Sequence, residues 1–295
     1  MLSLLILASE NPVEHVIDKP LPGLPITMHV MNMIVCAVLL VVTMMAAARA
    51  IGTGPESEGN ERYITKSRFG QLIEVFVEYL MTNVIRPQLG EKANTFAPFL
   101  LTMFFFILYN NLLGLIPLQD LQHLLGLHTT WIGGTATGNI AVTAALALIT
   151  FVVIQVNGVR SLGLGNYLKH YMGGAPPALA IIMIPVEIMG TFIKPFALAV
   201  RLFANMTAGH VLLATLLMFC TLGLKALGAF FGGGITIVSI LASIPIMFLE
   251  LFVAFLQAFI FMFLSTLFIA QLSHHHHDDH EHEHDHPPAP AGGHH

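Results

Sequence analysis

Ionisable and amide side chains occur within two of the most apolar stretches of this 295-residue chain, Ala178–Leu222 and Ile235–Leu272. These polar residues are Glu187, Lys194, Arg201, Asn205 and His210 in the first stretch, and Glu250 and Gln257 in the second. Carboxylates and imidazoles can pass protons, and ionisable groups inside a membrane usually mark an ion or proton path. The types and setting of these residues therefore predict proton or ion transfer.

Arg201 is the residue whose position is hardest to explain by structure alone, because it lies near the middle of a 45-residue apolar run. A charge at the centre of a bilayer costs roughly 2.5–3.5 kcal/mol on insertion scales, and a guanidinium stays protonated in proteins. A purely structural role explains Arg201 poorly. Asn205, Thr207 and Gln257, taken alone, are equally well explained as polar pairs between helices. Lys194 is better explained as a side chain that snorkels to the membrane surface.

The spacing of these residues predicts a polar face on the first stretch. Each residue of an ideal helix turns about 100°, so Glu187 and Lys194 lie within about 40° of Arg201. Asn205, one turn further on, joins the same face. His210 falls nearly opposite Arg201 and about 13 Å from it along the axis.

Composition places these stretches in a membrane protein. The chain is 55% hydrophobic and 10% charged, whereas soluble domains are about 25% charged. The mean hydropathy is +0.76. We expect Cys36 and Cys220, each in an apolar run, to be small core residues rather than a disulfide. The chain contains no GxxxxGK[ST] phosphate loop, so we expect it not to bind nucleotides or to act as an enzyme by itself.

Hydropathy predicts an all-α integral membrane protein with about five membrane-embedded helices and one amphipathic surface helix. We expect ordinary spans at Ile26–Ala48, Phe96–Ile116 and Ile140–Val156 and a surface helix over 67–86. The last two runs far exceed the ~20 residues of an upright crossing, so each is either a tilted helix or a pair of crossings. Gly232–Gly234 is the expected break between them. The predicted domains are an outer N-terminal segment (1–25), one transmembrane helical domain (26–272, with the long pair over 178–272) and a tail (273–295).

Basic residues predict the orientation, because they gather on the cytoplasmic side of a membrane. With this order of spans, two basic residues lie on one side, and eight lie on the other. The two are Lys19 and Lys225, and the eight are Arg49, Arg62, Lys66, Arg68, Arg86, Lys92, Arg160 and Lys169. We therefore expect the N-terminus outside and the C-terminus in the cytoplasm.

The C-terminal tail is rich in histidine and acidic residues and has the composition of a disordered segment. A solvated tail is the simpler interpretation. The alternative is binding of Zn²⁺ or Ni²⁺, or proton buffering, by histidines of which the first four are His274, His275, His276 and His277. Their spacing defines no site, so no metal centre and no cofactor are predicted.

Four motifs resemble subunit a of the rotary F-type ATP synthases in the order found there, over roughly residues 65–272. The motifs are "FFFILYNNLLGLIP", "GNIAVTAALAL", "KPFALAVRLFANMTAGH" and "ELFVAFLQAFIFMFLSTLFIA". The resemblance implies a proton-conducting stator whose last two helices form a tilted hairpin against a ring of c subunits. It also implies as partners subunit b of the peripheral stalk, the F1 sector through the complex, and the lipid bilayer, with no nucleic acid. The implied location is an energy-transducing membrane, in particular the bacterial plasma (inner) membrane.

The same resemblance assigns roles residue by residue. Arg201 matches the essential arginine that faces the ring carboxylates. The other matches are His210 and Glu250 in the proton-uptake half-channel, Glu187 near the release half-channel, and Asn205, Gln257 and Asn111 at polar positions along the path. Gly114 and Asn139 stand where many members of the family carry aspartates, and Ala141 where asparagine is common, so His123 or His128 could serve the outer path instead.

Two other kinds of function remain open at this point. A self-contained ion-coupled transporter could use the same residues, namely Glu187, Arg201, His210 and Glu250. A structural membrane anchor would leave the polar face unexplained. The residues do not distinguish H⁺ from Na⁺ coupling.

Overall fold

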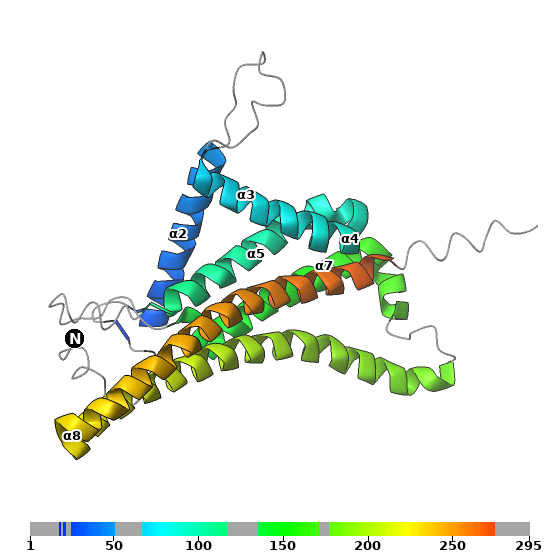
Figure 1. The fold of residues 1–295 in the computed structure, drawn as a ribbon. Coiled ribbons are helices and arrows are strands. Elements are labelled where there is room, and N and C mark those ends of the chain that lie inside the picture. The colour runs from blue at the N-terminus through cyan, green and yellow to red at the C-terminus, as the bar shows by residue number, and fades with distance from the viewer. Residues whose placement is uncertain are drawn as a thin grey trace, which may run out of the picture.

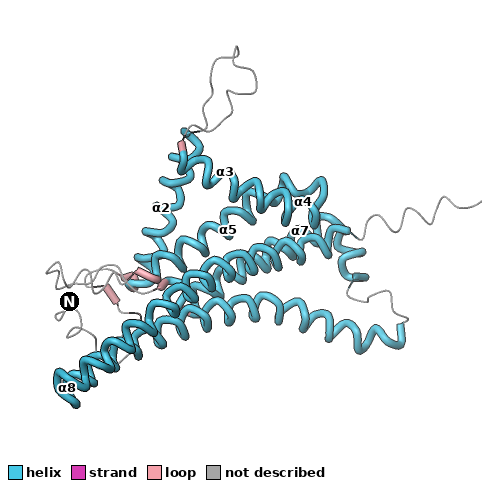
Figure 2. The backbone as a smooth tube through the Cα atoms, in the orientation of Figure 1, coloured by secondary structure: helices cyan, strands magenta, loops and turns pink. Residues whose placement is uncertain are grey.

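The computed structural model describes residues 18, 20, 21, 25–50, 67–116, 135–170 and 177–274. This part of the chain is almost wholly helical (Figure 2). Five helices in it are long and apolar enough to span a membrane, namely Met28–Arg49, Arg68–Gly114, Ile140–Arg160, Ile181–Gly228 and Phe230–Gln271. The predicted all-α membrane architecture is thus confirmed. The C-terminal tail from residue 275, and with it His275, His276 and His277, lies outside the described residues, as do His123 and His128.

Within the described part of the chain the first helix is α2 (Met28–Ala50), drawn in blue in Figure 1. It is followed by an amphipathic helix, α3 (Arg68–Leu80), that begins at the cap Ser67, whose hydroxyl accepts from the backbone N–H of Gly70 at 3.5 Å. Leu80 is buried, whereas the carboxylates Glu74 and Glu78 are exposed. The apolar face therefore packs on the bundle.

The segment that follows α3 turns the chain back into the bundle. It comprises a π-helix (η3, Met81–Ile85), a short helix (α4, Arg86–Leu89) and a 3₁₀ turn (η4, Gly90–Lys92). Gly90 has φ 54°, a value that glycine adopts without steric cost. The next helix, α5 (Ala93–Gly114), begins after this turn and carries much of the core, including Leu100, Phe104 and Ile107.

Helix α7 (Ile140–His170) follows a 3₁₀ turn, η5 (Ala136–Gly138). The helix extends well beyond the expected span Ile140–Val156, because the chain remains helical to residue 170. Gly163 has φ 74° and breaks the helix. The Tyr167 hydroxyl donates to Gln155 Oε1 at 2.9 Å. Twelve residues of straight helix would separate these two residues by about 18 Å, so the last part of α7 folds back.

The last element, α8 (Pro177–His274), is one hairpin of two long helices. We call residues 177–228 the first arm and residues 229–274 the second arm. Each arm is a single long helix, which settles the alternatives left by the length of the apolar runs. Figure 1 shows the second arm running obliquely beneath α5, with the first arm on its far side. The Asn111 side-chain amide donates to the Ala254 carbonyl at 3.1 Å, and Phe104 packs edge-on against Phe255 at 5.8 Å.

The expected break at Gly232–Gly234 is wrong, because the hairpin turns at Gly228. Gly228 has φ 72° and ψ −178°, a conformation that side chains with a Cβ rarely adopt. Gly232 serves a different purpose, since a Cβ on it would lie 2.4 Å from the Gly223 carbonyl oxygen. It lets the two backbones approach closely just beyond the turn, as small residues do between membrane helices.

A paired substitution tests this close approach. We expect Gly232→Ala to force the arms apart and to lower stability by about 1–3 kcal/mol, the usual cost of overpacking. Gly233→Ala is the matched control, because its Cβ would meet nothing within 4 Å. Thermal unfolding of the two variants in detergent measures the difference. Equal stability of the two variants would contradict the close packing of the arms.

Candidate functional site

The two arms of α8 run antiparallel, and this pairing brings their polar residues together. Near the turn, the Thr236 hydroxyl donates to the Cys220 carbonyl at 3.5 Å. Further along, the Asn205 side-chain amide donates to Gln257 Oε1 at 3.2 Å. Both Asn205 and Gln257 match polar positions of the path in the family resemblance. The hairpin therefore places Asn205 of the first arm in direct contact with Gln257 of the second.

Glu250 lies seven residues, or about two helical turns, before Gln257 on the second arm, and it packs against Gly209 of the first arm. Its side chain is 7% exposed, and a Cβ on Gly209 would lie 2.7 Å from Glu250 Oε1. Gly209 thus leaves the space that the carboxyl group fills. Oε1 has no hydrogen-bond partner within the described part of the chain. A buried carboxyl oxygen without a partner is costly, so such a group is available for a proton or a water molecule.

His210 and Glu250 line the same pocket, which has a volume of about 240 Å³. The pocket also contains Asn205 and is otherwise walled by apolar side chains and by Gly209. The two residues that the resemblance assigns to the uptake half-channel therefore line one pocket from opposite arms of the hairpin. A space of this size can hold several water molecules, each of which takes about 30 Å³ in the liquid.

A threonine outside the hairpin holds the imidazole of His210. Thr135, which is buried just before η5, forms a hydrogen bond through its hydroxyl with His210 Nε2. Thr135 in turn packs into the space left by Gly114 at the end of α5, where a Cβ would lie 2.2 Å from the Thr135 hydroxyl oxygen. A glycine in α5 therefore positions the group that orients His210.

Asn111 is fully buried between α5, η5 and the second arm. It donates to the Ala254 carbonyl at 3.1 Å and accepts from the Thr137 hydroxyl at 2.8 Å. Thr137 lies two residues from Thr135. The segment from Thr135 to Asn139 therefore presents polar side chains to both α5 and the hairpin.

Arg201 differs from these residues, because it lies on the exposed face of the first arm. Its neighbour Leu202 is fully buried, so the arm presents Arg201 away from the bundle. Among the described residues no carboxylate forms an ion pair with Arg201. The guanidinium is thus directed outward from an apolar helix, with no anionic partner in the described part of its own chain.

Glu187 and Lys194 line a second, smaller pocket on the other side of Arg201 along the first arm. This pocket has a volume of about 60 Å³ and lies between α7 and both arms. Its polar lining residues also include Thr150, Gln155 and Gln271. The Lys194 ammonium group lies 5.1 Å from the centre of the Phe268 ring. The face expected to carry Glu187, Lys194, Arg201 and Asn205 is therefore divided among two pockets and an exposed position.

The structure thus brings together His210, Glu250, Asn205 and Gln257, places Asn111 beside them through Ala254, and keeps Glu187 apart. Sequence reasoning missed Thr135, Thr137, Gly114 and Gly209 as residues that build the site. The described residues contain no group of three or more metal-ligating side chains. The side chain of His274 is not among those described.

Comparison with known proteins gives a consistent result. The family described as ATP synthase A chain matches residues 29–270. Proteins named ATP synthase subunit a are similar along most of the chain: that of Myxococcus xanthus is 43% identical over 257 residues, 85% of this chain and 75% of its own length. That of Chloroherpeton thalassium is 41% identical over 250 residues, which are 85% of this chain and 67% of its own length. That of Anaeromyxobacter dehalogenans is 42% identical over 273 residues (90% and 63%), so the chain spans under two thirds of this relative.

The packing of Gly114 against Thr135 gives a prediction about His210. We expect Gly114→Ala to displace Thr135 and to release the imidazole, since a hydrogen bond contributes about 0.5–1.5 kcal/mol. Gly138→Ala is the control, because its Cβ would lie 3.8 Å from Thr135 Cβ, an ordinary contact. The measurement is the rate at which diethyl pyrocarbonate modifies His210, followed by mass spectrometry. Modification should be several-fold faster in Gly114→Ala, and equal rates in both variants would contradict the proposed contact.

Proposed function

Because the chain belongs to the ATP synthase A chain family, we propose that it is the stator through which protons pass beside the ring of the F0 sector. The relatives carry the name ATP synthase subunit a. This subunit is a membrane component of the enzyme and not its catalytic subunit. It takes part in ATP synthesis and proton transport. We also propose two half-channels in this chain, a role for Arg201 between them, and the partners of the chain in the complex.

The exposure of Arg201 is the observation that carries the proposal. A permanent charge on an apolar helix is costly unless an anion meets it. Within the described part of the chain no carboxylate does so. We place the partner on another subunit, because a carboxylate at mid-membrane on each c subunit has the required chemistry.

The surface around Arg201 suits a helix packed closely against it. Ala197, Ala204 and Ala208 are exposed and lie on the same face as Arg201. Small residues let membrane helices approach each other closely. Leu249 of the second arm is also exposed, and it lines the same pocket as Ala208. We therefore place the c ring against this side of the hairpin.

The two pockets on either side of Arg201 supply the two half-channels in this proposal. The pocket of His210 and Glu250 takes up protons, and the pocket of Glu187 releases them. The two pockets have no lining residue in common, and Arg201 lines neither of them. This separation supports a path in which a proton can continue only by riding on a ring carboxylate.

Arg201 then couples proton flow to rotation by electrostatics. A ring carboxylate that approaches the guanidinium is favoured in its ionised form, because an opposite charge within ~4–6 Å lowers a carboxyl pKa. It must give up its proton on one side of Arg201 and gain one on the other. Each proton that crosses yields about 2.3 kcal/mol per 100 mV of potential. The same charge prevents a proton from leaking between the pockets.

The orientation follows from the basic residues of the described helices. Arg49 ends α2, Lys92 precedes α5 and Arg160 lies late in α7, so all three lie at one end of the bundle. This end is cytoplasmic in the proposal. The pocket of His210 lies at the opposite end, where α5 finishes and η5 begins, and it opens to the outside. Subunit b and, through the complex, the F1 sector complete the set of partners.

Substitution of Arg201 tests the proposed function. We expect Arg201→Ala to abolish ATP-driven proton pumping and ATP synthesis while the complex still assembles. Arg201→Lys should also fail, because a lysine can lose its proton on burial and lacks the planar fork of donors. Pumping in inverted vesicles and subunit content by blot are the measurements. Arg49→Ala, at the end of α2, is the matched control and should pump normally.

Coupled pumping by Arg201→Ala at the rate of the Arg49→Ala control would contradict the proposed function. A transporter that acts alone would differ in a second way. It would move its substrate in vesicles without an oligomeric c ring, whereas the stator should co-purify with the ring and be inactive without it.

The His210–Glu250 pocket gives a separate prediction. If these groups relay protons, His210→Ala and Glu250→Ala should each slow proton flux by roughly 10²-fold, the low end for loss of an acid–base group. The exchange His210→Glu with Glu250→His should recover part of the flux, because it returns one acid and one imidazole to the same pocket. The measurement is passive flux at a fixed potential. An exchange variant no faster than the single variants would count against the relay.

A further inference from the structure

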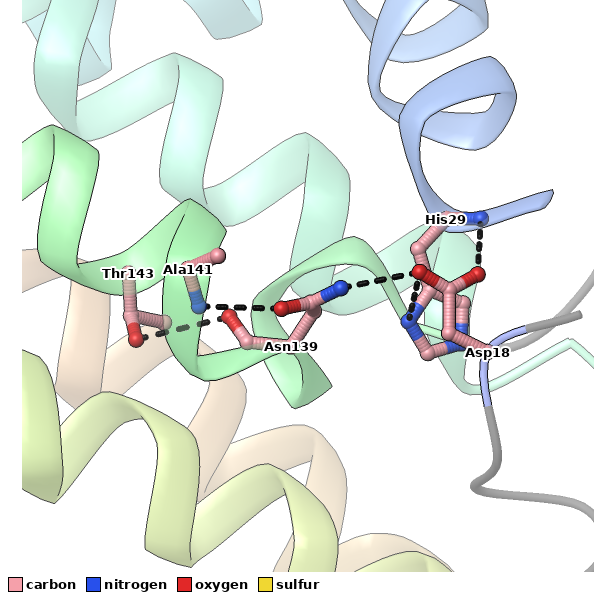
Figure 3. Close-up of polar contacts among 5 residues, drawn as sticks. All are labelled: Asp18, His29, Asn139, Ala141 and Thr143. Atoms are coloured by element: carbon pink, nitrogen blue, oxygen red, sulfur yellow. Dashed lines mark hydrogen bonds and ion pairs between the residues drawn. The ribbon is translucent and has the colours of Figure 1, made fainter. Parts of the chain in front are cut away.

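A second polar cluster lies at the same end of the bundle as the pocket of His210 and Glu250, which we call the uptake pocket. It is made by Asp18, His29 and Asn139 (Figure 3). Asp18 Oδ1 accepts from the backbone N–H of His29 at 3.1 Å, and Oδ2 accepts from the Asn139 side-chain amide at 2.9 Å. The imidazole Nδ1 of His29 lies 3.9 Å from Oδ2. The cluster joins the N-terminal segment to the beginnings of α2 and α7.

Asp18 and His29 differ sharply in exposure. The Asp18 side chain is 20% exposed, whereas that of His29 is 2% exposed. Neither ring nitrogen of His29 has a hydrogen-bond partner among the described residues. A buried imidazole without hydrogen bonds is costly to keep, and its nearest ionisable group is the partly exposed carboxylate. This arrangement allows proton exchange between water, Asp18 and His29.

The segment between α5 and α7 links this cluster to His210. Asn139, at its end, holds Asp18, and its first described residue, Thr135, holds His210. Between them, Thr137 bonds to Asn111. Five residues place the two ends no more than about 14 Å apart even when fully extended. A run of hydroxyl and amide groups thus leads from Asp18 to the uptake pocket.

We propose that Asp18 and His29 form the outer, proton-collecting end of the uptake half-channel, with the Asp18 carboxylate as the group that first takes a proton from water. The proton bound by the carboxylate passes to His29 or along the Thr135–Asn139 segment toward His210, and the carboxylate returns to its ionised form. No other bond is made or broken. This inference rests on the proposed function, because it assigns residues to the same path.

The same contacts could instead give Asp18 a purely structural role. Its carboxylate satisfies a backbone N–H in the first turn of α2, as an N-terminal cap does. It also holds Asn139, whose own Oδ1 accepts from the Ala141 N–H at 2.9 Å at the start of α7. A structural role of Asp18 needs only its hydrogen bonds, whereas proton uptake by Asp18 needs an acid. The two roles are therefore separable by exchange of the acid and the amide.

The experiment compares proton flux through the whole complex in vesicles for three variants with the wild-type chain. Asp18→Asn removes the acid and keeps an acceptor for His29. Asn139→Ala keeps the acid and removes its hydrogen bond. Asp18→Asn with Asn139→Asp moves the carboxylate across the same bond and keeps both partners. We expect flux to fall several-fold in Asp18→Asn, to fall less in Asn139→Ala, and to recover in the exchange variant.

Chemical rescue is a readout that would not respond if Asp18 had only a structural role. Formate added on the outer side should speed proton flux in Asp18→Asn, because a small weak acid can deliver protons in place of the missing carboxyl group. It should not speed flux in Asn139→Ala. Wild-type flux in Asp18→Asn would overturn the inference. Equal losses in Asp18→Asn and Asn139→Ala without formate rescue would assign Asp18 to structure alone.

Failure of this inference is distinguishable from failure of the proposed function. Arg201→Ala, measured in the same vesicles, reports on the function. If Arg201→Ala is inactive and Asp18→Asn is normal, only the assignment of the outer end is wrong. If Arg201→Ala pumps normally, the proposed function itself is wrong. Subunit content by blot and the conservative variant Asp18→Glu, which should keep most of the flux, exclude loss of folding as the cause.

Discussion

The charge of Arg201 is the constraint on which this structure depends. A guanidinium cannot be neutralised in a protein, and the apolar surroundings of the hairpin make an unpaired charge costly. The first arm nevertheless presents Arg201 away from the bundle, on a face of small and apolar residues. The rest of the site is arranged around that position, with one polar pocket toward the turn of the hairpin and another toward its free ends.

Glycines determine how closely the polar groups come together. Gly209 makes room for the Glu250 carboxyl group, Gly114 makes room for Thr135, and Gly232 lets the two arms meet beyond the turn. In the first two cases the missing Cβ allows contact between residues that lie far apart in the sequence, and in the third it allows contact across the turn of the hairpin. Small residues at helix crossings are a general means of close packing in membranes, and here they also fix where the acid and the imidazole lie.

The sequence could predict the membrane-spanning helices, their order and the presence of polar residues within the hairpin, because hydropathy and helical spacing are local properties. It could not tell which glycine turns the hairpin. Composition favoured Gly232–Gly234, but only backbone geometry separates the positive φ of Gly228 from the close contact of Gly232. Thr135 and Asp18 left no local signal, since Thr135 meets a residue 75 positions away, and Asp18 one 121 positions away. The roles assigned to the site residues remain predictions.

The most direct test of the central claim is a structure of the intact complex with the c ring bound, in which the surroundings of the Arg201 guanidinium are resolved. The account predicts that a ring carboxylate lies within ~4–6 Å of the guanidinium, close enough for its charge to favour the ionised form. It also predicts that the exposed face of the first arm is covered by ring helices. An Arg201 side chain paired with a carboxylate of its own chain, or directed into lipid away from the ring, would contradict it.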